Sequence, residues 1–191
     1  MSRPTSSSPP AARRADAERN RDKILAAART AFADPDAEVS MAEIARRAGV
    51  GMATLYRNFP GRRELLEALY TGEVDAIRAA AETVDGATPG ARLVAWLRRF
   101  FAFSTAKRHI ASEVLTHVES SNPMFNENRD RVLAAGRPLL AAAQDAGEVR
   151  DDLTLEQVLD MIVAIARIHG DPGDVERILQ ITFDGLRPQP A

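Results

Sequence analysis

The chain has 191 residues, enough for one compact domain or for a small domain joined to a larger one. Hydrophobic residues make up 45% and charged residues 27%, the composition of a soluble globular protein, and no apolar run approaches the roughly 20 residues that span a bilayer. The chain has no cysteine, which excludes disulfides and thiolate chemistry and suits a cytoplasmic location. The net charge of −2 is unevenly spread: residues 1–63 hold 12 Lys and Arg against 7 Asp and Glu, as expected of a basic nucleic-acid-binding segment joined to an acidic domain.

The first elements in chain order are a tail and a helix. Residues 1–17 combine a Ser-Pro run with arginines and little apolar surface, so we expect a flexible basic tail and no secretory signal. Apolar residues at helical spacing then predict a helix over about residues 19–33, which ends at the breaker Asp34-Pro35-Asp36. Its expected core face consists of Ile24, Ala28, Ala31 and Phe32.

Four arginines, in the tail and at the start of this helix, are placed like a basic arm that could follow a nucleic-acid backbone or enter a minor groove. They are Arg13, Arg14, Arg19 and Arg21. A solvated run of charges is the equally simple interpretation, so these residues alone indicate no partner.

Residues 41–59 have the spacing of two short helices that cross over a tight turn. Ser40 and Glu43 form a capping-box pattern, which predicts a helix beginning near Met41. Gly49 permits the turn, and the next helix, over about residues 52–58, stops before Pro60. The expected small core is Ile44, Ala48, Val50 and Leu55, with Ala45 at the close approach of the helices. This is a helix-turn-helix pattern; geometry alone also allows an αα-hairpin with no DNA role.

A long fourth helix is predicted over about residues 62–84, closed by a turn at residues 86–90. Arg62 and Arg63 open it, although cations oppose the positive end of a helix dipole. A phosphate bound at this N-terminus would explain the two arginines, whereas neutralisation by Glu64 and Glu67 is the simpler alternative.

Beyond residue 90 the pattern predicts further helices and no strand. They are expected at about residues 91–105, 109–120, 125–146, 155–168 and 175–186. The predicted fold class is therefore all-α. A three-helix, helix-turn-helix domain at residues 18–63 is joined by the long fourth helix to a helical domain at residues 64–187.

The run from Ala42 to Pro60 resembles the DNA-binding domain of the TetR (tetracycline repressor) family, and the resemblance extends over about residues 19–66. It implies a homodimer that binds double-stranded operator DNA through a recognition helix at about residues 52–58. It also implies that residues 64–187 bind a small-molecule effector and dimerise, with no cofactor and no membrane association. Most members of this family repress transcription, so the resemblance favours a repressor, and the sequence leaves a transcription activator as the alternative.

The resemblance also implies which side chains contact DNA. Thr54 and Arg57 are expected at bases or phosphates, Tyr56 at a phosphate, and Ser40 at the DNA backbone. Arg62 stands where the family commonly has Lys. Low hydrogen-bonding capacity at the start of the recognition helix favours apolar contact with thymine methyl groups there. The full expected set is Ser40, Met52, Ala53, Thr54, Tyr56, Arg57 and Arg62.

Two further expectations concern the C-terminal domain. Bulky side chains could line an effector pocket, although aromatic residues at helical spacing are also typical of plain core. The expected lining is Trp96, Phe100, Phe103, His117, Phe125 and Met161. The last two helices are apolar around much of their circumference, so residues 154–186 are expected to form a four-helix dimer interface, with burial inside one subunit as the alternative.

One constellation suggests other chemistry. His109, Glu113 and His117 follow one another at four-residue spacing, so adjacent pairs could bind a divalent metal beside a ligand from another helix. The outer two are about 12 Å apart along a helix, too far for one ion to take all three. We therefore expect no metal. A metal hydrolase at these residues and a structural adaptor are the alternatives to a regulator, and the chain lacks serine-elbow and glycine-rich phosphate motifs.

Overall fold

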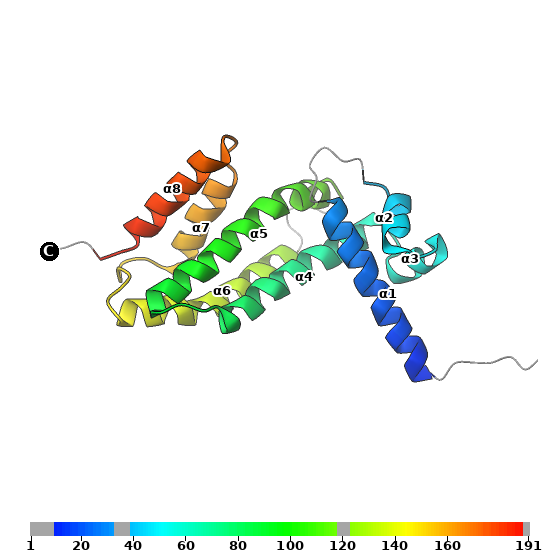
Figure 1. Ribbon diagram of the computed structural model, residues 1–191, viewed down its shortest axis with the longest axis horizontal. Helices are drawn as coiled ribbons and strands as arrows, with labels where there is room; N and C mark the ends of the chain where they lie inside the picture. Colours follow the sequence, from blue (N-terminus) through cyan, green and yellow to red (C-terminus); the bar gives the residue numbers. More distant parts are fainter. Residues whose placement is uncertain (1–9, 33–38, 118–122, 189–191) are drawn as a thin grey trace, which may run out of the picture. The chain divides into compact units, whose positions relative to one another are not determined.

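The computed structural model describes residues 10–32, 39–117 and 123–188, and side chains over residues 14–32, 39–105 and 123–188. These residues form eight helices and no strand, which confirms the all-α prediction (Figure 1). The helices are α1 (Pro10–Ala31), α2 (Met41–Ala48), α3 (Met52–Asn58), α4 (Arg62–Thr83), α5 (Pro89–His117), α6 (Pro123–Asp145), α7 (Leu155–Ala166) and α8 (Pro172–Gly185). They fall into two compact units that divide between Leu69 and Tyr70, inside α4.

The N-terminal unit packs α1 against α2 and α3. The predicted core face of α1 is buried in full, at Ile24, Ala28, Ala31 and Phe32. In the helix-turn-helix Ile44, Ala45 and Leu55 are buried as expected, whereas Ala48 and Val50 are only half-buried. Larger side chains from the segment before α2, the end of α3 and the start of α4 complete this core: Val39, Phe59, Leu65, Leu66 and Leu69.

Helix α1 begins at Pro10, although the sequence pattern places residues 10–17 in a flexible tail. Proline is well tolerated in the first turn of a helix because its missing N–H has no partner there. Residues 11–19 are mainly Ala and Arg, which favour helix by their own propensity. Propensity therefore extends the helix beyond the apolar pattern on which the prediction rested.

The C-terminal unit is built around α5, which packs against α6 and α7, while α7 pairs with α8 (Figure 1). Trp96 is fully buried in this core, and its indole Nε1 donates a hydrogen bond to the carbonyl of Ile77, 3.0 Å away. Gly136 of α6 lies against the Trp96 ring. The indole therefore ties α4, α5 and α6 together in this unit.

The predicted break between residues 105 and 109 is wrong, because α5 continues as one helix to His117. No Gly or Pro lies between Phe103 and His109, so nothing in the chain ends the helix there. Conversely α6 contains Pro138 and still continues to Asp145, as predicted. Among the residues that the structure describes, no helix is long and apolar enough to cross a membrane.

Candidate nucleic-acid interface

Helix α3 presents one exposed stripe of the residues predicted to contact DNA. Met52, Ala53, Tyr56 and Arg57 are all exposed, at the spacing of one helix face, while Leu55 on the opposite side is buried. Large hydrophobic groups are usually covered, yet Met52 is 39% and Tyr56 46% exposed. The structure thus brings these four side chains together on a surface that the fold itself does not use.

Thr54 lies half-buried beside this stripe and is connected to it. The Arg57 Nη2 donates a hydrogen bond to the Thr54 hydroxyl over 3.2 Å. The Asn58 amide donates to the Thr54 carbonyl over 2.8 Å. The Arg57 guanidinium therefore has a fixed neighbour within α3 and retains further N–H donors for an outside acceptor.

The turn before α3 has the backbone conformation that the sequence predicts. Gly49 has a φ of 65°, which a residue with a Cβ adopts only with strain, and its N–H bonds to the carbonyl of Arg46. At the other end of α3 Phe59 is extended, with φ of −138° and ψ of 98°, as Pro60 requires. These two residues set the start and the end of the exposed α3 face.

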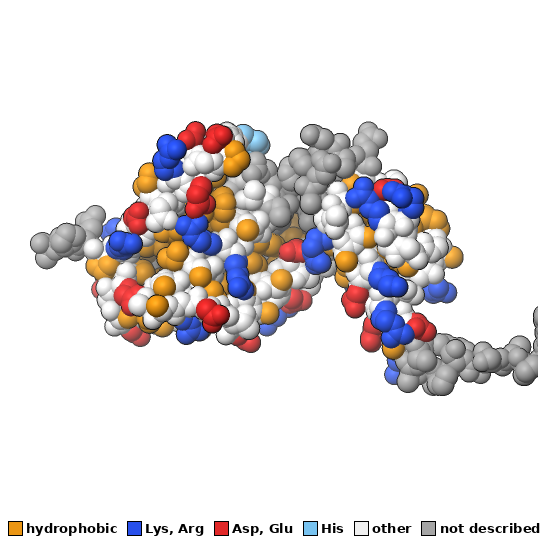
Figure 2. Space-filling model, in the orientation of Figure 1, with side chains coloured by type: hydrophobic (Ala, Val, Ile, Leu, Met, Phe, Trp, Pro, Cys, Tyr) orange, Lys and Arg blue, Asp and Glu red, His pale blue; other side chains and the backbone are white. Residues whose placement is uncertain are grey.

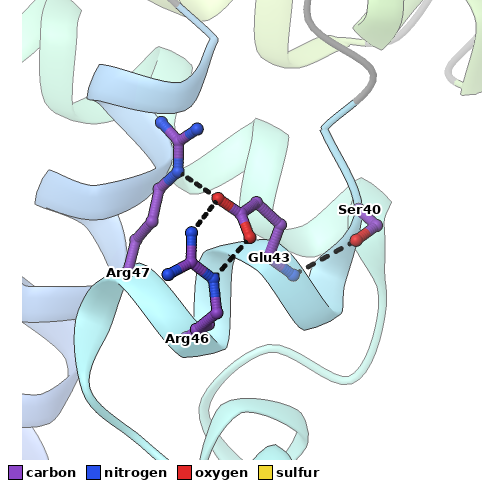
Figure 3. Close-up of polar contacts among 4 residues, drawn as sticks. All are labelled: Ser40, Glu43, Arg46 and Arg47. Atoms are coloured by element: carbon purple, nitrogen blue, oxygen red, sulfur yellow. Dashed lines mark hydrogen bonds and ion pairs between the residues drawn. The ribbon is translucent and has the colours of Figure 1, made fainter.

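Ser40 forms half of the predicted capping box. Its hydroxyl accepts a hydrogen bond from the Glu43 N–H at 3.1 Å, and the residue is exposed at the start of α2. The Glu43 carboxylate turns to two arginines instead of reaching back to the cap (Figure 3). It accepts from the Arg46 Nε at 2.8 Å and Nη2 at 2.7 Å, and from the Arg47 Nε at 2.6 Å. These charge-assisted bonds lower the pKa of Glu43 to about 2.

Arg62 is engaged by the protein itself. Its Nη1 donates to the buried Val39 carbonyl, and its guanidinium lies over the Phe32 ring, 5.0 Å from the centroid. Arg63 beside it pairs with Glu67 at 2.9 Å. For Arg63 this is the alternative to a bound phosphate, in which a glutamate neutralises the arginine. Arg62 therefore joins the start of α4 to the end of α1 and to the residue before Ser40.

Part of the predicted basic arm is also used internally. The Arg21 guanidinium stacks on the Phe59 ring at 4.4 Å and donates to the Asn58 carbonyl at 3.5 Å. Arg19 pairs with Asp16, and the side chain of Arg13 lies outside the described residues. Lys and Arg side chains remain exposed over the surface of this unit (Figure 2).

The structure does not gather the predicted effector residues around one opening. Trp96, Phe100 and Phe103 are buried in the core, where neighbouring rings lie about 6 Å apart. Phe125 packs at the edge of that core against Tyr70, with centroids 5.5 Å apart, while Met161 is on the surface. The side chain of His117 lies outside the described residues.

A groove of about 700 Å³ lies elsewhere in the C-terminal unit. None of the five predicted residues whose side chains the structure describes lines it. Its walls are the second half of α4 and the middle of α6, with one residue from α5. The lining is Asp75, Arg78, Ala79, Ala81, Glu82, Arg92, Arg131, Ala134, Ala135, Pro138, Leu139 and Ala142.

Sequence reasoning missed these groove residues because they carry no motif. Alanines and charged residues alternate at helical spacing on any solvated helix. Only packing shows that Asp75 of α4 meets Arg131 of α6, or that Asn128 is the one polar residue buried in the described parts of the chain. No pattern within either helix predicts a partner more than fifty residues away.

The structure does not describe the side chains of the three possible metal ligands, His109, Glu113 and His117. Over the side chains that the structure does describe, no group of three or more His, Cys, Asp and Glu residues is placed to hold a metal ion.

Comparison with known proteins gives a match over both units. Residues 24–69 match the N-terminal family of bacterial regulatory proteins of the tetR type, and residues 88–188 match the C-terminal domain of SbtR-like transcriptional regulators. The chain belongs to the TetR family of transcription regulators. It is therefore a DNA-binding regulator, in a family of proteins that are not enzymes.

Two solved structures are similar over nearly their whole length. The TetR transcriptional regulator SCO0520 from Streptomyces coelicolor is 37% identical, with a TM-score of 0.76, and the match covers 89% of this chain and 99% of that one. A TetR transcription regulatory protein from Mycobacterium vanbaalenii is 34% identical, with a TM-score of 0.74 and coverage of 92% and 99%. The ketosteroid transcriptional regulator KstR2 of Mycobacterium tuberculosis, 23% identical with a TM-score of 0.58 over 88% of this chain and 95% of that one, shares the fold. No curated protein matches the chain.

Proposed function

We propose that this TetR-family protein is a cytoplasmic, homodimeric repressor that a small-molecule effector releases from its operator. The observation that carries its DNA-binding part is the exposed α3 stripe of Met52, Ala53, Tyr56 and Arg57. A short helix with one face locked into a core and the other free is suited to enter a major groove. Thr54 beside this stripe and Ser40 at the start of α2 complete the proposed contacts, with Arg62 at the phosphate backbone.

The chemistry of the stripe favours a division of labour. Arg57 has several free donors beside the Thr54 hydroxyl and is suited to a guanine edge or a phosphate. Met52 and Ala53 have no side-chain hydrogen-bonding group beyond a weak thioether acceptor and are suited to thymine methyl groups. Tyr56, with its ring at the surface, offers a hydroxyl to a phosphate.

Exposed apolar side chains on α7 and α8 support a homodimer through residues 154–186. Met161, Ile168, Ile178 and Ile181 are exposed, Ile181 by 66%. Met161 lies on α7, Ile168 lies just beyond the end of that helix, and Ile178 and Ile181 share one face of α8. A second copy would cover these side chains, forming the four-helix contact common in helical dimers.

The place of α4 in the chain supports release by an effector. The helix begins among the core residues of the helix-turn-helix unit and ends among those of the C-terminal unit. A ligand that binds one position of α4 more tightly than another shifts the population of that position. The recognition helices of the dimer then lose the separation that the operator requires.

Two variants test the DNA-binding part of the proposal. Arg57→Ala is expected to weaken binding to DNA flanking the gene and to relax its sequence preference, because a base-contacting donor is lost. Arg62→Ala is expected to weaken operator and scrambled DNA alike and to lower the melting temperature as well, because it removes the contacts with Val39 and Phe32.

The measurement is a titration over a salt series with operator and scrambled DNA, accompanied by thermal melts of each variant. Arg129→Ala, which removes an exposed arginine of α6 outside both the helix-turn-helix and residues 154–186, is the control and should bind like the parent protein. Unchanged affinity and preference in Arg57→Ala would contradict the assignment of α3.

A further inference from the structure

The groove between α4 and α6 combines an apolar floor with a charged rim. The floor is made of small or short apolar groups, mainly Ala79, Ala134, Ala135 and Leu139. Three guanidiniums and two carboxylates form the rim, and all five belong to residues that line the groove: Asp75, Arg78, Glu82, Arg92 and Arg131. Its volume of about 700 Å³ is within the range of small-molecule sites.

Helices α4 and α6 are bridged at one end of this groove by a single carboxylate. Asp75 of α4 accepts from Arg131 of α6 and from Arg78 one turn further along α4, the latter at 3.1 Å. Arg131 is the less exposed of the two arginines, with 32% of its side chain exposed against 46% for Arg78. The link between the two helices at this point is therefore an exchangeable ion pair at the mouth of a groove.

A buried amide beside Arg131 has unused donors. The Asn128 Oδ1 accepts from the Arg131 Nη1 at 3.1 Å, while its Nδ2 is buried and has no hydrogen-bond partner. A buried donor without a partner typically costs about 1–3 kcal/mol, and native proteins retain few of them. Asn128 is 3% exposed and does not line the groove, so it acts on the groove through Arg131, from whose Nη1 it accepts a hydrogen bond.

The spare hydrogen-bonding capacity of the groove is thus on the donor side. Arg131, Arg78 and Arg92 all line it and have N–H groups beyond those already bonded. Among the described residues that line the groove, Glu82 is the one carboxylate besides Asp75, and it lies one helical turn beyond Arg78. A ligand that fits must bring acceptor oxygens, and a carboxylate matches the planar fork of an arginine.

We propose that this groove is the effector site and that the effector is an amphipathic carboxylate. Its carboxylate binds Arg131 in place of Asp75, and its apolar body covers the alanine floor between α4 and α6. The exchange breaks the ion pair between the helices and thereby frees α4 from α6. The identity of the site as the effector site rests on the proposed function; binding of the carboxylate does not.

The test uses the full-length protein and a panel of probes in matched pairs. Hexanoate, octanoate, decanoate, benzoate and phenylacetate are each compared with the corresponding primary amide. We expect at least one carboxylate to raise the melting temperature by roughly 5 °C at about 100 times its Kd, and its amide to have no effect. Equal effects of acids and amides, or no effect of any acid, would overturn the proposal.

Variants localise the binding. Arg131→Gln should weaken carboxylate binding at least tenfold, Arg131→Lys should restore part of it, and Asp75→Asn should strengthen it because a competing carboxylate is removed. Arg129→Gln is the matched control: it lies on the same helix and pairs with Asp160 of α7 at 3.1 Å, but does not line the groove. Melts without ligand show whether each variant folds, and equal affinity of Arg131→Gln and Arg129→Gln would refute the site.

Operator binding separates the site from the function. If carboxylates bind the parent protein but not Arg131→Gln, and operator affinity stays the same, the groove is a carboxylate site and release by an effector is wrong. If another compound releases the parent protein and Arg131→Gln equally from DNA, the function holds and the groove assignment fails.

Discussion

Single charged side chains in the helix-turn-helix unit differ in how far their partners tie them to the fold. The Arg62 guanidinium donates a hydrogen bond to the Val39 carbonyl and lies over the Phe32 ring, while the Arg57 guanidinium donates to the Thr54 hydroxyl of its own helix. Glu43 is committed to two arginines of α2. Arg62 therefore holds segments of the unit together in addition to its proposed phosphate contact, whereas Arg57 retains donors for binding.

The contacts of Glu43 predict a specific dependence of stability on pH. Its pKa falls from 4.5 to about 2 in the folded protein, chiefly through hydrogen bonds from Arg46 and Arg47. Because the folded pKa is below the unfolded one, this stabilisation is present above about pH 4.5 and is lost as the pH falls toward about 2. The difference in melting temperature between the parent protein and Glu43→Gln should be constant from about pH 5 to 8 and shrink below it.

This difference is measured by thermal melts of both proteins across that pH range. Carboxylates elsewhere titrate equally in the two proteins and cancel. Arg46 and Arg47 are exposed, so the difference should also decrease with added salt. A difference that stays constant down to pH 3 would show that Glu43 does not interact with the arginines as described.

At the level of elements, the crossing of α5 and α6 depends on one missing side chain. A Cβ on Gly136 would lie 2.4 Å from Cη2 of Trp96 and 2.9 Å from Cδ2 of Leu155. Both neighbours are buried, and the Trp96 indole is held by the Ile77 carbonyl, so none of these atoms can readily move away. The residue is therefore required by packing between helices, since its own helix would prefer alanine.

Gly136→Ala is accordingly expected to destabilise the protein. Overpacking a closed core costs about 1–3 kcal/mol, partly offset by about 1 kcal/mol of helix propensity. Thermal melts should show a lower melting temperature, by a few degrees at most per kcal/mol for a chain of this size. Gly185→Ala in α8, where an added Cβ meets nothing within 4 Å, should be neutral or stabilising. Equal effects of the two substitutions would contradict the close approach.

At the scale of the whole molecule, the exposed apolar side chains of α7 and α8 predict the oligomeric state. In the C-terminal unit hydrophobic side chains reach the surface among charged ones (Figure 2). Ile181 is the most exposed of the large hydrophobic residues that the structure describes. Burying such groups gains about 25 cal/mol per Å² of apolar surface, which favours self-association through α7 and α8.

Ile181→Asp is expected to convert a dimer to a monomer, because a charge without a partner would be buried at the centre of the contact. Light scattering at micromolar concentration measures this directly. Ala141→Asp, which adds the same charge at an exposed position of α6, is the control and should remain dimeric. A parent protein that is itself monomeric under these conditions would reject the proposed interface.

The sequence alone was sufficient for the fold class and for the helix-turn-helix, because both rest on local rules. Ser40, Gly49 and Pro60 set the ends of α2 and α3 through backbone geometry that depends on neighbours within a few residues. The buried face of α1 follows from helical periodicity alone. The same local rules place Met52, Tyr56 and Arg57 on one face.

Only the tertiary structure determines which side chains of the C-terminal unit contact one another. The aromatic residues expected to line a pocket are mostly core, because Trp96 and its neighbours fill the space between α4, α5 and α6. The groove lies instead between alanines and charged residues of α4 and α6, and Asp75 and Arg131 meet across it. Contacts between helices depend on how whole helix faces pack, and no pattern within one helix encodes its partner.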